Sequence, residues 1–286
     1  MELHAHASNR NCNPSSRIHA RATVASSSLG LVGDFRRLTH ATARLLAMAR
    51  QRVVPASAIA ASSLTQWTLG WGLMFLLFRV GVFRKYSADF SNRVVSIIHA
   101  IVAVYYAYLT FTNGWAGMFD DIGGANTPAQ ALCMAISLSY FVYDLIYCAV
   151  VGELESVFHH MFTIGGLASG VFEGKSGSEL VACLFLMEVS NPSLHLRTVL
   201  AEMGLKNSAL ASMNNLIFAL VFLVCRLVIG PPLVYKTMVC PDNAYIVKAG
   251  GFGILAVSLM WGMKIVNMLL REVKKLAGLG GKKKTA

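Results

Sequence analysis

Two long stretches of this chain contain no Asp, Glu, Lys or Arg, and they constrain the fold more than any other feature. Ala58–Phe78 runs for 21 residues without such a charge, and Val94–Thr112 for 19. A helix needs about 20 apolar residues to cross a bilayer, where every backbone polar group must be satisfied within the protein. Only 14% of all residues are charged, against about a quarter in soluble domains. The sequence therefore predicts a polytopic helical membrane protein.

Five further apolar stretches complete the predicted all-α bundle. Seven spans are predicted, with six as the lower count, because one stretch is short and another contains Glu188 and Pro192. The short connections between stretches favour a compact bundle without a separate soluble domain. The five stretches are Ala131–Val151, Val157–Phe172, Leu180–Leu196, Asn215–Tyr235 and Val247–Leu270.

The basic residues indicate orientation, because cytosolic loops of membrane proteins carry an excess of Lys and Arg. Loop Arg79–Arg93 holds four such residues and is placed in the cytosol. Loop Asn113–Gln130 has acids but no Lys or Arg, so it is placed on the far side. Seven spans return the basic tail, Arg271–Ala286, to the cytosol. The net charge of +11 is thereby explained without a nucleic-acid partner.

The two ends of the chain suggest different subcellular locations. Residues 1–57 contain eight Arg and many Ser, which is typical of a transit peptide or a disordered segment, and Met48 offers an alternative start. The membrane domain is predicted over residues 58–270. In the tail, Lys283 and Lys284 fit a dilysine retrieval signal, although a basic tail attracted to anionic lipid has the same composition. We expect an endoplasmic reticulum membrane protein with a cytosolic C-terminus, with the plastid envelope as the alternative.

Ionisable and amide side chains inside the spans are candidate functional residues, because burying them in a bilayer is costly. The predicted topology places all of them in the cytosolic half of the membrane. Three of them follow an i, i+3, i+7 spacing that defines one helical stripe, and interhelical hydrogen bonding is the plain alternative for them. Pro192 can kink that stripe and free a carbonyl. The residues are His99, Asp144, His159, His160, Glu188, Asn191 and His195.

Arg226 also lies within a predicted span, in "FLVCRLVIGPPLVY". A guanidinium at such depth needs an anionic partner. Asp144 or Glu188 would supply an ion pair, and a lipid phosphate is the functional alternative. Most cysteines fall inside spans and are interpreted as buried small apolar residues, without disulfide or metal roles.

The adjacent pair His159 and His160 has three interpretations. Neighbouring helix residues point about 100° apart, so both imidazoles do not readily face one ion, and no metal is predicted there. One histidine can instead act as a general base, with Glu188 or Asp144 as the orienting acid. The third interpretation is that both are interfacial histidines near the headgroups.

Four motifs in order resemble the TLC domain, a membrane domain shared by ceramide synthases and translocating-chain-associating proteins. The similarity extends over roughly residues 64–270 and is strongest to the uncharacterised plant and animal TLC-domain-containing branch, with its Glu-x-Ser-x-Pro-x-x-x-x-Arg pattern at Glu188–Arg197. The four motifs are NRVVSIIHAIVAVYYAY (Asn92–Tyr108), SLSYFVYDLI (Ser137–Ile146), FHHMFTIGGLASG (Phe158–Gly170) and LMEVSNPSLHLRTVL (Leu186–Leu200).

The resemblance implies a helix bundle around a central lipid-accessible cavity, usually in the endoplasmic reticulum. In ceramide synthases the histidine pair belongs to the acyl-transfer site, and His159-His160 followed by Thr163 matches the start of that motif. The motif's later His-Asp dipeptide is missing here. Acyl transfer is therefore an alternative to a role in lipid homeostasis without catalysis.

Three functions follow from these observations. The first is membrane lipid homeostasis, through lipid binding, sensing or control of composition, with His99, Asn191, His195 and Arg226 as lipid-binding residues. The second is an acyl-CoA-dependent acyltransferase with His159, His160, Glu188 and Asp144 as catalytic residues. The third is a cargo or chaperone receptor for membrane proteins. Acyl-CoA is the co-substrate of the second function, and no cofactor is predicted. Membrane lipids are the expected partners, with a homo-oligomer or membrane-protein partners left open.

Overall fold

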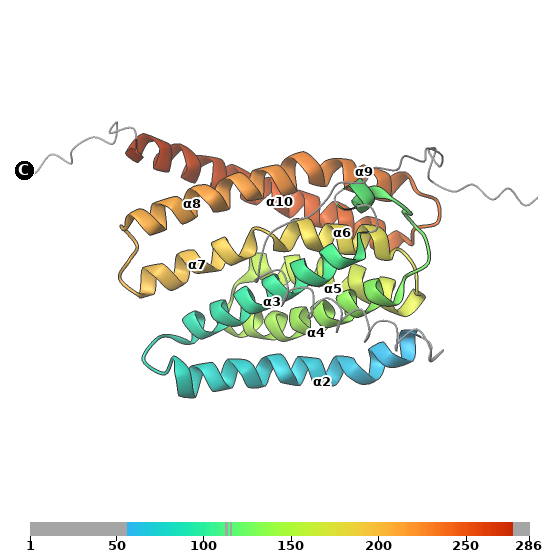
Figure 1. The fold of residues 1–286 in the computed structure, drawn as a ribbon, viewed down its shortest axis with the longest axis horizontal. Coiled ribbons are helices and arrows are strands. Elements are labelled where there is room, and N and C mark those ends of the chain that lie inside the picture. Colours follow the sequence, from blue (N-terminus) through green and yellow to red (C-terminus); the bar gives the residue numbers. More distant parts are fainter. Residues whose placement is uncertain (1–55, 112–113, 115, 277–286) are drawn as a thin grey trace, which may run out of the picture.

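The computed structural model describes residues 56–111, 114 and 116–276, and its named elements in this part of the chain are all helical. The helices run side by side along the long axis of the molecule (Figure 1). This arrangement confirms the prediction of an all-α, polytopic helical membrane protein. The basic N-terminal segment up to residue 55 and the dilysine pair Lys283 and Lys284 lie outside the described residues.

Five of the predicted spans are single helices whose bounds extend only a few residues beyond the apolar stretches. Local sequence sets several of their ends. Ser87 accepts a hydrogen bond from the Phe90 backbone N–H, and Thr127 and Gln130 form a reciprocal capping box. Gly152 ends a helix in the left-handed conformation, which glycine adopts at little cost. The helices are α2 (Ala56–Leu77), α3 (Ala88–Thr110), α4 (Pro128–Val151), α5 (Leu154–Glu173) and α10 (Tyr245–Leu276).

The predicted span Leu180–Leu196 is broken into two helices, α6 (Gly177–Glu188) and α7 (Asn191–Glu202). Pro192 occupies the first turn of α7, where its missing N–H costs least. The sequence predicted a kink at this proline. The break lies just before it, at Val189 and Ser190, because proline is tolerated at the start of a helix but not in its interior.

The predicted span Asn215–Tyr235 is also irregular. It comprises α8 (Ala209–Phe222), a seven-residue π-helix η3 (Leu223–Ile229) and α9 (Gly230–Val239). Two prolines follow Gly230 at the start of α9, where they cannot donate to the preceding turn. Wide turns of this kind are rare and occur frequently at functional sites. Arg226 lies in the middle of η3.

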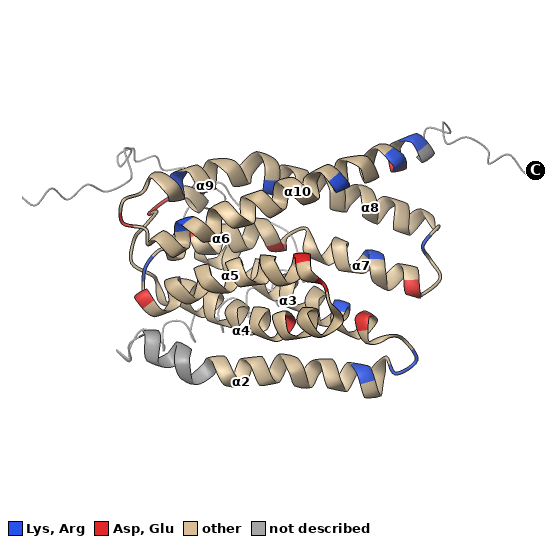
Figure 2. Ribbon diagram, turned by 180° about the vertical axis from the view of Figure 1, so that it is seen from behind, with Lys and Arg blue, Asp and Glu red and all other residues tan. Residues whose placement is uncertain are grey.

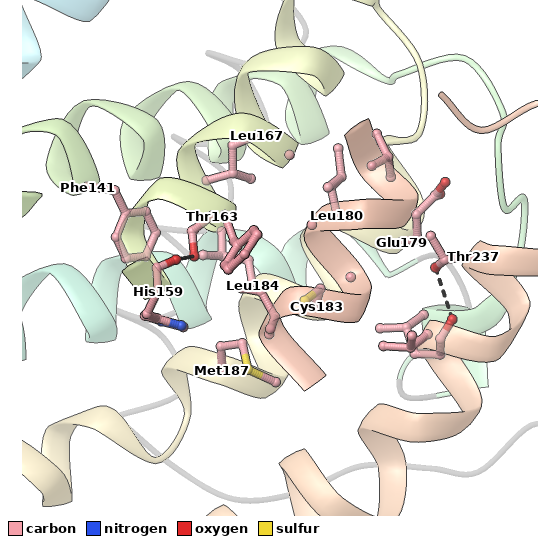
Figure 3. A pocket seen from close by; sticks show the side chains of 18 residues that line it. Phe141, His159, Thr163, Leu167, Glu179, Leu180, Cys183, Leu184, Met187 and Thr237 are labelled. Carbon is pink, nitrogen blue, oxygen red and sulfur yellow. Dashed lines mark hydrogen bonds between the residues drawn. The ribbon is translucent and has the colours of Figure 1, made fainter. Parts of the chain in front are cut away.

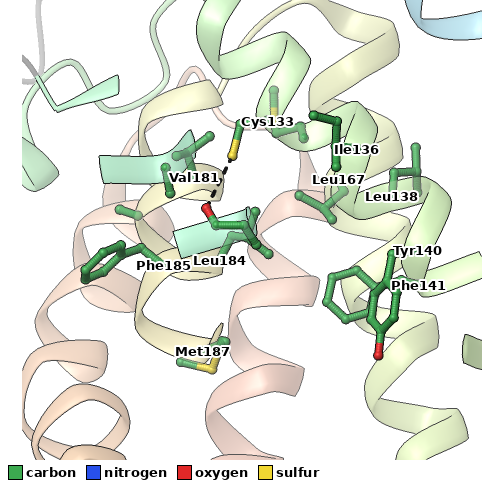
Figure 4. Close-up of a cluster of buried hydrophobic side chains, with 14 of the residues drawn as sticks. Cys133, Ile136, Leu138, Tyr140, Phe141, Leu167, Val181, Leu184, Phe185 and Met187 are labelled. Atoms are coloured by element: carbon green, nitrogen blue, oxygen red, sulfur yellow. Dashed lines mark hydrogen bonds between the residues drawn. The ribbon is translucent and has the colours of Figure 1, made fainter. Parts of the chain in front are cut away.

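Four helical segments within the described residues are long and apolar enough to cross a membrane: α3, α4, the run Ala209–Val239 and Tyr245–Lys274 of α10. In the most apolar window of α4, 61% of residues are buried, against 33% in each of the other three. Helix α4 is therefore the central helix. Its buried face packs with Leu167 of α5 and with α6 in the core shown in Figure 4.

The connections between helices gather at two ends of the bundle. At one end the Ser87 hydroxyl donates to Glu202 Oε2 over 2.7 Å. At the other end Lys175 Nζ donates to the Asp242 carbonyl over 3.0 Å, and the Ser176 N–H donates to the Gly124 carbonyl over 2.8 Å. Charged residues concentrate toward these ends, with few along the middle of the helices (Figure 2). This pattern is typical of helices that cross a bilayer.

Candidate functional site

Helix α5 directs its two adjacent histidines toward different surroundings. Their rings are 5.5 Å apart and both residues are buried. The His159 ring lies 5.2 Å from that of Trp261 on α10 and lines an apolar cavity. His160 faces α4, where its Nε2 lies 3.5 Å from Asp144 Oδ2. The two histidines therefore have separate environments, as expected for neighbouring helix positions.

Asp144 belongs to a buried polar group between α3 and α4. Asn92 donates from Nδ2 to Asp144 Oδ1 over 3.0 Å and accepts from the Tyr143 hydroxyl over 2.6 Å. Cys148 follows Asp144 by one helical turn, and its sulfur, an Asp144 oxygen and a His160 nitrogen lie within 4.8 Å of one another. Among the described residues, these three form a group whose ligand atoms could hold a metal ion. The sequence interpretation missed Cys148, although its i+4 spacing from Asp144 was a usable signal.

Glu188 lies beside His99 and not beside the histidine pair. His99 Nδ1 is 3.7 Å from Glu188 Oε2, and both side chains are almost fully buried. The imidazole is stacked on Tyr140 with ring centroids 3.7 Å apart, and Trp71 contacts it edge-on. Of the two acids proposed to orient the histidine pair, only Asp144 is placed next to either histidine. His99 is enclosed by aromatic rings and lines neither of the cavities described below.

Arg226 is 2% exposed and connects η3 to the break between α6 and α7. Its Nη2 donates to the Met187 carbonyl over 2.6 Å and to Asn191 Oδ1 over 3.0 Å. The guanidinium carbon also lies 4.8 Å from the centre of the Phe222 ring. The sequence left two partners open for Arg226, an ion pair with Asp144 or Glu188 and a lipid phosphate. Within the described chain no carboxylate oxygen is in salt-bridge range of Arg226. Its Nε and Nη1 have no hydrogen-bond partner there.

The predicted stripe of Glu188, Asn191 and His195 is divided by the helix break. Glu188 faces His99, Asn191 binds Arg226, and His195 is buried on α7, which packs against α3. His195 lines neither cavity. The Met187 carbonyl, close to the break before Pro192, accepts from Arg226. Glu188 and Asn191 still share a side-chain hydrogen bond across the break.

A narrow apolar cavity of about 50 Å³ lies between α5, α6, α9 and α10. His159 and Phe141 are on one side of it, and Glu179 and Thr237 are on the other (Figure 3). The Glu179 carboxylate accepts from the Gly123 backbone N–H at 3.2 Å. Most of the remaining lining is aliphatic. Known ligand pockets are likewise mostly apolar, with a few placed polar groups.

A second, smaller cavity of about 10 Å³ adjoins the first. The two share part of their lining, and Arg226 lines the smaller one. Arg226 therefore lies beside an apolar space whose lining continues to His159. The shared lining residues are Cys183, Met187, Leu233, Val234 and Ile254.

Residues 89–270 match the family model described as the TLC domain. The chain is 26% identical over 153 residues to TLC domain-containing protein 4 C of Dictyostelium discoideum, an alignment covering 52% of this chain and 55% of the relative. It is 24% identical over 148 residues to TLC domain-containing protein 2 of Danio rerio, covering 50% and 59%. The chain thus spans little more than half the length of these curated relatives. No solved structure matches it.

Proposed function

This chain belongs to the TLC-domain family, and we propose that it acts in membrane lipid homeostasis by binding one lipid chain inside the helix bundle. The observation that carries the proposal is the narrow apolar cavity between α5, α6, α9 and α10 that reaches His159. An apolar space inside a bundle already surrounded by lipid accepts an acyl chain without the loss of polar contacts. A cavity lined by only a few polar groups gives such a chain a fixed direction.

Arg226 is the residue we assign to the polar end of the lipid. Its Nε and Nη1 lack partners in the described residues, and it lines the small cavity that adjoins the larger one. Each of these two nitrogens carries an N–H that can donate to a carboxylate or phosphate oxygen. Asn191 would position the guanidinium through its existing hydrogen bond. His99 and His195, which line neither cavity, have packing roles in this proposal.

The second candidate function is acyl transfer from acyl-CoA, which the placement of His159 on the cavity favours. A general base also needs a group that orients its ring. Here Asp144 lies next to His160, whereas no hydrogen-bond partner of His159 Nδ1 occurs in the described part of the chain. We therefore place binding ahead of catalysis. A cargo-receptor role is supported by no feature of the described helices.

We propose seven crossings of the endoplasmic reticulum membrane with the C-terminus in the cytosol. The connections support this count because they alternate between the two ends of the bundle. The basic loop between α2 and α3 and the end of α7 lie at the end that we assign to the cytosol. The acidic connection over residues 116–127 lies at the other end, together with the α5–α6 and α9–α10 connections.

A cavity-filling variant tests the binding proposal. Cys183 lines both cavities, so Cys183→Phe puts a large ring where the lipid chain would lie. Leu220→Phe is the matched control, because Leu220 is 55% exposed on the outer surface of the bundle. Purified proteins are exposed to a photoactivatable fatty acid, and labelling is measured by mass spectrometry. We expect Cys183→Phe to lower labelling at least fivefold and Leu220→Phe to leave it unchanged. Equal labelling of both would refute the proposal.

The same proteins separate binding from catalysis. Each is incubated with labelled acyl-CoA and a mixture of lipid acceptors, and products are resolved by chromatography. We expect bound lipid without turnover. Product formed by the wild type and lost in His159→Ala, with His160→Ala as the comparison, would overturn the non-catalytic interpretation in favour of acyl transfer.

A further inference from the structure

The geometry points to a transition-metal site of zinc type between α4 and α5, formed by Asp144, Cys148 and His160. This inference is independent of the lipid-binding proposal, because none of the three residues lines either cavity. The sequence argued against a metal shared by His159 and His160. The site inferred here uses only one histidine of the pair, with two residues from the neighbouring helix.

The three side chains bring one oxygen, one sulfur and one nitrogen within 4.8 Å of one another, and all three residues are buried. In a tetrahedral zinc site the ligand atoms are roughly 3.3–3.8 Å apart, given metal–ligand bonds of about 2.0–2.3 Å. The His160 Nε2 to Asp144 Oδ2 distance of 3.5 Å already falls in this range. The remaining separations need to shorten by about 1 Å or less, which small side-chain rotations supply.

The surroundings of Asp144 prepare one of its oxygens for this role. Asn92 donates to Oδ1, and Tyr143 in turn holds Asn92 through a 2.6 Å hydrogen bond. The carboxylate is thereby fixed with Oδ2 directed at His160. Hydrogen bonds of this kind to a ligating carboxylate orient it and commonly affect metal affinity by 10–100-fold.

Charge balance favours a divalent cation at this position. A carboxylate and a thiolate together neutralise Zn²⁺, so the bound site carries no net charge inside the bundle. The nearby Arg93 is engaged elsewhere, with Nη2 2.7 Å from Glu153 Oε1 and Nε 3.0 Å from Asp89 Oδ1. Thiolate, imidazole and carboxylate are the ligand types that zinc uses, and three protein ligands leave its fourth position open.

The test measures zinc bound to the full chain. Protein purified with a tag that binds no metal is stripped by a chelator, loaded with Zn²⁺ and desalted before elemental analysis. Residues outside the described part of the chain include further histidines and Cys12, which can also bind zinc. The test therefore compares the zinc content of the variants with that of the wild type and does not use the total zinc content. We expect Cys148→Ser to bind one equivalent less than the wild type. The control Cys133→Ser changes another buried cysteine of α4 and should bind as much as the wild type.

Cobalt supplies a second readout that does not depend on stoichiometry. Co²⁺ bound by a thiolate gives a charge-transfer absorption, which should be present in the wild type and in Cys133→Ser and reduced in Cys148→Ser. Asp144→Asn and His160→Ala should weaken Zn²⁺ binding at least tenfold, and circular dichroism checks that they fold. A folded wild type whose zinc content equals that of Cys148→Ser overturns the inference. That result would leave fatty-acid labelling of the wild type unaffected, so the two proposals fail separately.

Discussion

His160 Nε2 lies 3.5 Å from Asp144 Oδ2, whereas its neighbour His159 lines an apolar cavity beside Trp261 of α10. The two histidines therefore face different surroundings. His160 of α5 contacts α4, and His159 of α5 contacts α10. The following predictions test the contacts that hold these helices in place.

Asn92→Ala should destabilise the protein, because Asn92 supplies a donor to Asp144 and an acceptor to Tyr143 in a buried site. Leaving a buried polar group unpaired costs about 1–3 kcal/mol. Thermal unfolding in detergent, followed by circular dichroism, measures the effect. Asn267→Ala is the control, since Asn267 is exposed on α10 and its loss should be nearly neutral. Equal stabilities for the two variants would show that the Asn92 hydrogen bonds contribute nothing.

Arg226 and Asn191 should be energetically coupled, because the guanidinium donates directly to the Asn191 side chain. A double-mutant cycle with Arg226→Gln and Asn191→Ala measures their coupling free energy. Contacting residues in one hydrogen-bond network typically couple by about 0.5–3 kcal/mol. Pairing Arg226→Gln with Asn267→Ala supplies a distant reference, for which additivity is expected. Additive behaviour of the Arg226 and Asn191 variants would contradict the contact.

Gly250→Val should loosen the packing of α10 on α5. A Cβ atom at Gly250 would lie 3.3 Å from the Phe162 carbonyl oxygen, so the helices approach closely only because the residue is small. Overpacking of such a site costs about 1–3 kcal/mol, which a lower unfolding temperature would reveal. Gly70→Val is the control, because its Cβ would meet no atom within 4 Å. A larger loss of stability at Gly70 than at Gly250 would be inconsistent with this account.

A glycosylation tag tests the proposed orientation. Inserted in the loop after α3, near Asp120, the tag should be modified, because that end is assigned to the lumen. A tag between α7 and α8, near Lys206, should remain unmodified. Glycosidase digestion followed by electrophoresis distinguishes the two forms. Modification of the second tag alone would invert the topology.

The sequence was informative about the helices because burial in a bilayer is a property of single segments. Charge-free stretches such as Val94–Thr112 located helix α3 to within a few residues at its C-terminal end. The break at Val189 and Ser190 was only partly foreseen, because proline marks a disturbed turn without fixing which residue leaves the helix. The π-helix around Arg226 had no sequence signal.

The candidate residues were predictable but their partners were not. Intramembrane polar residues are rare enough to be found by inspection, and Asp144, His160 and Arg226 are all buried as expected. Their partners depend on how each helix is rotated about its own axis, which hydropathy does not determine. The sequence therefore left open which acid lies beside which histidine. It also treated Cys148 as an ordinary apolar residue.

The Arg226 contacts have a consequence for how this protein is made. Asn191 and the Met187 carbonyl enter the membrane 35 and 39 residues before the arginine that satisfies them. At 5–20 residues per second, this interval lasts about 2–8 s. During that time Asn191 and the Met187 carbonyl lack their arginine donor. The Arg226 hydrogen bonds at the junction between α6 and α7 therefore form late in biosynthesis. A chain interrupted before η3 lacks them.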